Sequence, residues 1–142
     1  HSLSCHVVSS AALPFASRME IVLSGDATSG CSAVIQRCIG VYELQDAQHV
    51  HGRPVWRHIG EDVFVVFVQH RGWHVQGRSE AQGLGGSHGW LCIMDERATA
   101  PWLTGPDMHW LAAPKAPGAA WEPQPHICCV ALAPNVAMQQ LQ

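Results

Sequence analysis

The sequence predicts a single small all-β domain, an antiparallel meander of six to eight short strands that closes into a barrel or sandwich. Short apolar runs alternate with turns rich in Gly and Pro, which is typical of strands joined by tight connections. A large aromatic side chain recurs near each turn, supplied by Trp56, Trp73, Trp90, Trp102, Trp110 and Trp121. A chain of 142 residues is also long enough to bury its own core.

Residues 19–58 contain three strand candidates and one helical turn. Met19–Leu23 is apolar and ends at a Ser-Gly-Asp turn signal. Ser32–Cys38 is short and predicts one helical turn, after which Ile39–Leu44 predicts the second strand. Pro54 opens the third, where its missing N–H costs no ladder hydrogen bond.

The strongest strand signal, in residues Asp62–Gln69, is apolar on both faces. This pattern predicts a central strand that is covered on both sides. The next run, Trp73–Gln76, alternates between apolar and polar residues, so we expect one of its faces to meet water. After a Gly-rich hairpin loop, the remaining strand candidates are Trp90–Met94, Asp107–Leu111 and His126–Leu132.

We expect three segments: an N-terminal arm or leader remnant in residues 1–18, a β module in 19–133, and a C-terminal tail in 134–142. The surface is poor in charge, because only 13% of residues are charged and Lys115 is the single lysine. With a net charge of −3 there is no basic patch for nucleic acid. No apolar run approaches the roughly 20 residues of a membrane span.

Six cysteines are present, an even number that fits disulfides in an oxidising compartment and buried thiols in a reducing one. Cys31 and Cys38 flank a short segment and form the most credible disulfide pair. Cys128 and Cys129 are adjacent, so on a strand they face opposite ways.

The sequence lacks the patterns expected of catalytic and metal sites, so we expect no enzyme, no cofactor and no metal. The ten histidines do not have the spacing of zinc ligands. The acidic pairs Glu61-Asp62 and Asp95-Glu96 lie in turns, where carboxylates usually face water or cap a segment. The loop 83–89 has His88 in place of the third glycine of a dinucleotide-binding loop and leads into a strand.

Four short motifs follow one another along the chain: Gly40-Val41-Tyr42-Glu43, Gly52-Arg53-Pro54-Val55-Trp56, Gly72-Trp73 and Gly89-Trp90-Leu91. In this order they resemble a small β module, rich in Trp and Gly, that is found in many algal and protist proteins and has an N-G-R-P-x-[YW] core. His51 stands in place of the Asn, and Val63–Val68 replaces a strand usually rich in Tyr. The resemblance covers about residues 20–132. It implies a display or recognition domain with no assigned activity.

Arg53, Trp56 and Tyr42 are candidates for either a structural turn or a ligand contact. The proline after Arg53 favours an extended backbone, from which the guanidinium can bond loop carbonyls, pair with a carboxylate or contact a ligand. Exposed aromatic rings also stack on sugars, and Tyr42, Trp73 and Trp102 are the best candidates for that role. Most tryptophans in a domain of this size must nevertheless build the core.

From these observations we expect a non-enzymatic protein-interaction module, an accessory or stabilising subunit whose partners are other protein subunits. An algal organellar complex such as a photosystem is consistent with this expectation, with attachment to a membrane complex but no span. A secreted carbohydrate-binding module is the alternative. A plastid or extracellular location is therefore favoured over the cytosol.

Overall fold

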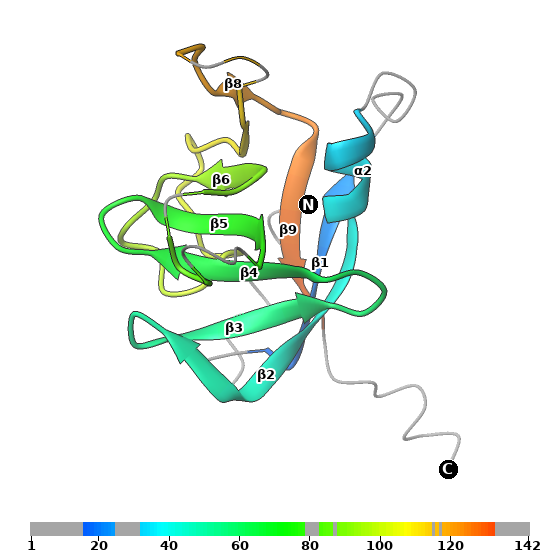
Figure 1. Cartoon of the computed structure of the whole chain (residues 1–142), viewed down its shortest axis with the longest axis vertical. Coiled ribbons are helices and arrows are strands. Elements are labelled where there is room, and N and C mark those ends of the chain that lie inside the picture. The colour runs from blue at the N-terminus through cyan, green and yellow to red at the C-terminus, as the bar shows by residue number, and fades with distance from the viewer. Residues whose placement is uncertain are drawn as a thin grey trace.

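The computed structural model describes residues 16–24, 32–78, 83–86, 88–114, 116 and 118–132. Within these ranges the chain forms one antiparallel sheet and one short helix, so the all-β prediction is confirmed (Figure 1). None of the described helical residues belongs to a helix long and apolar enough to span a membrane. Most of the predicted N-terminal arm and the whole predicted tail lie outside the described residues, so these boundaries stay predictions.

Strands β1 to β8 follow one another as a meander, and β9 returns to pair with β1. The described residues hold nine strands, more than the six to eight expected, because β7 and β8 are two-residue ladders and β8 has no apolar run to predict it. The elements are β1 (Arg18–Leu23), α2 (Ala33–Cys38), β2 (Gly40–Val50), β3 (Arg53–His58), β4 (Val63–Val68), β5 (Gly72–Gly77), β6 (Leu91–Ile93), β7 (Leu111–Ala112), β8 (Glu122–Pro123) and β9 (Ile127–Ala131).

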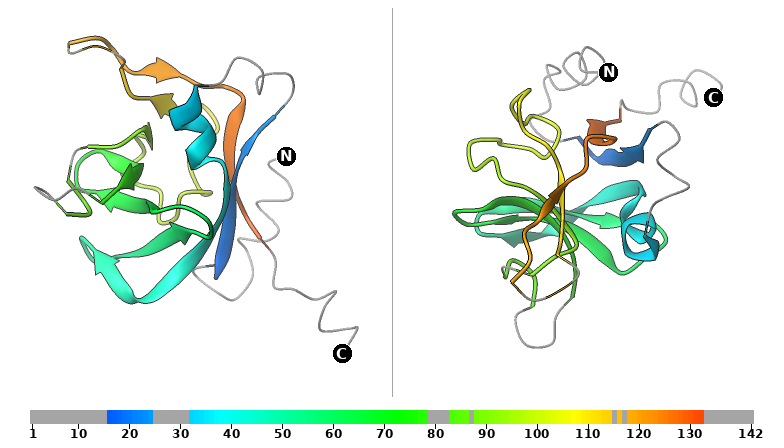
Figure 2. Two further views of the ribbon diagram at one scale, coloured as in Figure 1. Left: turned by 45° about the vertical axis from the view of Figure 1, so that its right-hand side comes forward. Right: turned by 90° about the horizontal axis from the view of Figure 1, so that it is seen from above.

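The sheet curls because its two edge strands are neighbours in the sequence. The strand order is β8-β7-β6-β5-β4-β3-β2-β1-β9, which puts β8 and β9 at opposite edges. In a flat sheet, eight spacings of about 4.8 Å would separate these edges by about 38 Å. The path from Pro123 to Ile127 spans at most about 14 Å. The sheet therefore bends round until its edges approach each other, as Figure 2 shows.

The inside of the curl holds the main hydrophobic core. Its largest fully buried side chains are Trp56, Trp73, Tyr42 and Met19. On β4, Val63, Val65 and Phe67 face this core, whereas Phe64, Val66 and Val68 form a second buried cluster on the outer face. The prediction that this strand is covered on both faces is confirmed.

The cover on the outer face comes from the loop that precedes β6. The Gln76 amide donates to Gly86 O at 3.1 Å and to His88 O at 2.7 Å, and its oxygen accepts from Gly85 N at 2.6 Å. His74 and Gln76 are both 0% exposed. The expected wet face of β5 is therefore wrong, because the loop folds back over it and supplies the partners that water would otherwise provide.

Gly72 begins β5 with a φ of +109°, and a Cβ there would collide with Ile93 O and lie 2.7 Å from Asp95 N. In Gly72→Ala we expect the free energy of unfolding, measured by urea denaturation, to fall by about 3 kcal/mol, because overpacking adds to left-handed backbone strain. Gly52 has a φ of +75° with no atom within 4 Å of such a Cβ, so Gly52→Ala should lose only about 1 kcal/mol. Equal losses would contradict the importance of the close β5–β6 approach.

Candidate functional site

Three of the tryptophans singled out in the sequence meet in one cluster inside the curl. The ring of Trp56 lies 5.8 Å from that of Trp73 and 5.4 Å from that of Trp102, both in edge-to-face geometry. Trp73 also packs edge-on against Phe67 at 5.3 Å. Such pairs stabilise a core beyond the area that they bury.

Arg53 joins this cluster through two contacts. Its guanidinium lies 4.2 Å above the centre of the Phe67 ring, a cation–π geometry. Its Nη1 donates to Ala98 O at 3.2 Å, the same carbonyl that accepts from Trp73 Nε1 at 3.0 Å. The guanidinium thus bonds a loop carbonyl, one of the structural roles considered for it.

Tyr42 belongs to the same hydrophobic core and packs beside His58. Its hydroxyl donates to Cys38 O at 2.6 Å, and its ring meets the His58 ring at 5.0 Å. Burial raises the pKa of Tyr42 far above its ordinary value. Gly40 admits this histidine, since a Cβ at Gly40 would lie 2.6 Å from His58 Nε2.

These contacts leave no aromatic face of the candidate residues for a sugar to stack on. Tyr42 and Trp73 are 0% exposed, and Trp102 is 8% exposed. Trp56 is fully buried too, with its Nε1 donating to Ala16 O at 3.0 Å. All four side chains act as core in this structure.

The proposed disulfide lies only partly within the described residues. Cys38 is buried at the end of α2, and its Sγ donates to Val34 O at 3.4 Å. Cys31 is outside the described residues, so the pairing stays a prediction. On β9, Cys128 is exposed and Cys129 faces the core 3.5 Å from Met19 Sδ, the opposite orientations expected of strand neighbours.

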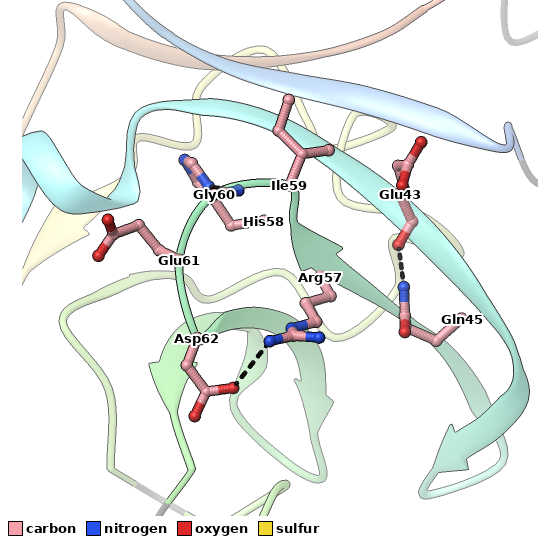
Figure 3. Close-up of a pocket in the computed structure, with 8 residues that line it drawn as sticks. All are labelled: Glu43, Gln45, Arg57, His58, Ile59, Gly60, Glu61 and Asp62. Carbon is pink, nitrogen blue, oxygen red and sulfur yellow. Dashed lines mark hydrogen bonds and ion pairs between the residues drawn. The ribbon is translucent and has the colours of Figure 1, made fainter.

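A polar pocket of about 390 Å³, which sequence reasoning missed, opens where β2, β3 and the β3–β4 turn meet. Its lining comprises Glu43, Gln45, Arg57, His58, Ile59, Gly60, Glu61 and Asp62, drawn in Figure 3. Gly60 N donates to His58 Nδ1 at 2.9 Å, so the Nε2 carries the proton and donates to Ile39 O at 2.9 Å. Both hydrogen bonds hold the β3–β4 turn, which forms one wall of the pocket. The sequence feature that could have indicated this site is Ile59, an apolar residue inside a polar turn.

The pocket's carboxylates are neutralised by arginines from β1, α2 and β3. The pairs are Arg18–Glu43 at 3.0 Å, Arg37–Glu61 at 3.1 Å and Arg57–Asp62 at 3.5 Å. All six side chains are about half exposed, so each pair contributes at most about 1 kcal/mol to stability. Figure 3 shows Arg57 reaching Asp62 and the Gln45 amide turned back to the Glu43 carbonyl.

A second polar group lies buried on the outer face of β5 and β6. His74 and Cys92 are cross-strand partners, and both are 0% exposed. Burial, with a smaller contribution from Arg71, lowers the pKa of His74 to about 4, and burial raises that of Cys92 to about 11. Among the described residues, His74 Nε2 and Arg71 Nε have no hydrogen-bond partner.

The described part of the chain brings no three His, Cys, Asp or Glu side chains together in a group that could hold a metal ion. The carboxylates of the pocket face arginines, and both ring nitrogens of His58 bond the backbone. The candidate site is therefore a shaped polar surface with one prominent apolar side chain, Ile59.

If Arg53 holds the loop in place, Arg53→Met should lower the free energy of unfolding by about 1–2 kcal/mol, because it keeps much of the stem but loses the donor and the charge. The matched control is Arg97→Met, at an exposed arginine, which should change stability by less than about 0.5 kcal/mol. Thermal and urea denaturation measure both. An unchanged Arg53→Met variant would contradict the structural role.

No model of a known protein family matches this chain, and searches of curated proteins and of solved structures also found no significant match. The resemblance to the module rich in Trp and Gly therefore stays a prediction.

Proposed function

We propose that this chain is a non-enzymatic protein-interaction module that serves as an accessory or stabilising subunit of a larger assembly. The observation that carries the proposal is Ile59, whose side chain is 63% exposed at the rim of the pocket. Burying a large aliphatic side chain is worth about 1.5–3 kcal/mol. Burial of the exposed Ile59 side chain against a partner would therefore contribute favourably to the free energy of binding.

The surroundings of Ile59 support a protein partner. Val34 on α2 is 43% exposed and lies one helical turn from Arg37, whose side chain reaches Glu61 in the pocket. We call Val34, Arg37, Ile59 and Glu61 the α2–turn surface. Apolar side chains bordered by partly exposed charged pairs match the usual anatomy of interfaces, with an apolar centre and a polar rim.

The state of the pocket's polar groups favours recognition over acid–base chemistry. A general acid or base needs an ionisable group that is free to reach the substrate. Here the imidazole of His58 is used at both nitrogens to hold the turn. The carboxylates of Glu43 and Asp62 already have arginine partners.

The first experiment is to purify the native protein from its source in mild detergent and to identify the complex with which it migrates on a native gel. We expect a defined complex in which the chain is present in a fixed ratio. Recovery only as a free monomer at every detergent concentration tested would contradict the subunit proposal.

Ile59→Asp should then weaken rebinding of the recombinant chain to the depleted complex by at least about 30-fold, because a charge replaces an apolar contact at the centre of the surface. The matched control is Leu103→Asp, at a residue 39% exposed and outside the pocket lining, and it should rebind normally. Both variants should keep their thermal stability within about 0.5 kcal/mol, as is usual for surface positions. Equal rebinding by Ile59→Asp and wild type would exclude the α2–turn surface.

A further inference from the structure

His74 occupies a position that is closed from several sides, and none of the described acidic side chains pairs with it. Its ring lies 6.2 Å from that of Trp121, the residue before β8, in an edge-to-face contact. A Cβ on Gly89 would lie 3.4 Å from its Cδ2, so the loop backbone passes close by. Cross-strand partners on β4 and β6 are Val66 and Cys92. The result is an imidazole with 0% exposure.

The hydrogen bonding of His74 suits only the neutral ring. Its Nδ1 lies 3.3 Å from Gly72 O, to which it donates a proton. Its Nε2 is buried and has no partner among the described residues. A proton added there would create a buried N–H without an acceptor among the described residues, and it would place a positive charge in a buried site.

The charged and titratable groups that face His74 oppose this proton. Arg71, in the turn before β5, and His88, in the covering loop, both disfavour the charged form. On β6, Cys92 is a neutral thiol, since burial raises its pKa to about 11. Glu122 follows Trp121 but is exposed on β8 and is not among the groups that act on His74.

We infer that His74 is an acid-sensitive latch: proton uptake at its Nε2 releases Trp121 and uncovers the outer face of β5 and β6. The imidazolium becomes hydrated only by leaving its site, and Trp121 then loses its edge-to-face contact with the His74 ring. Below this cover lies the Cys92 thiol, which becomes accessible to solvent. Figure 1 shows β5 and β6 side by side, with β8 above them.

The direction of the pH dependence follows from the pKa of His74, about 4 in the closed state against an ordinary 6.5. The closed state is fully favoured above pH 6.5, and this advantage is lost as the pH falls through about 4. By linkage, the population of the open state should rise on the order of 50-fold between pH 7 and pH 4.5.

The test uses the thiols already present in the full chain. 4,4′-Dithiodipyridine, which labels thiols in mild acid, is added at pH 7 and pH 4.5, and the labelling rate at each cysteine is read by peptide mass spectrometry. Exposed Cys128 reports the intrinsic reactivity of a thiol at each pH, and core-facing Cys129 reports global unfolding. Relative to both, labelling of Cys92 should accelerate on the order of 50-fold in acid.

His74→Gln, which cannot take up a proton in this range, should abolish the acceleration, whereas His109→Gln, at an exposed histidine, should leave it intact. In Trp121→Ala, Cys92 should be labelled rapidly even at pH 7. This measurement does not depend on whether the His74 variant folds. The latch proposal is contradicted by an unchanged acceleration in His74→Gln or by slow labelling of Cys92 in Trp121→Ala at pH 7. It is also contradicted if the labelling rates of Cys92 and Cys129 rise together in acid.

Discussion

The short connection between β8 and β9 is the constraint on which the rest of the structure depends. It ties together the two edges of a nine-stranded sheet, and a flat sheet of that width cannot satisfy it. Curling follows, and with it a concave side that only large side chains can fill. Five of the six tryptophans serve this interior, because a strongly curved sheet leaves a wide interior and indole rings fill it efficiently. They are Trp56, Trp73, Trp102 and Trp110 in the core and Trp90 packed against it.

The buried indole N–H of Trp73 needs an acceptor, and the loop between β6 and β7 supplies it. Ala98 O accepts from both Trp73 and Arg53, so a single carbonyl links two strands to that loop. The loop is itself organised by Asp95, whose carboxylate accepts from Arg97 N at 3.1 Å and Gly105 N at 2.9 Å. An acidic side chain at the surface thereby positions the carbonyl that the buried tryptophan requires.

The strands other than β8 could be predicted from local pattern, whereas the contacts between distant segments could not. The segment Asp62–Gln69 predicted a strand covered on both faces, because its own residues are apolar on both faces. The burial of His74 and Gln76 is not indicated by their own segment, since it depends on a loop about ten positions later that returns to bond the Gln76 amide. Arg53 was marked by its proline and could be assigned a loop carbonyl, but not the carbonyl of Ala98, 45 positions away. The pocket was missed because it is shaped by the turn after His58, and turn shape is weakly encoded in composition.

The pairing of the first strand with the last has a consequence for how the chain is made. Met19 and Cys129 are 110 positions apart yet lie in contact on β1 and β9. Closing so long a segment costs conformational entropy before any contact compensates for it, and non-local β pairing of this kind folds slowly. During synthesis β1 can pair only with β2 until the residues of β9 leave the ribosome. Until that moment one side of β1 is an open strand edge, the kind of surface that pairs with other chains, so a newly made chain is exposed to such pairing until β9 is in place.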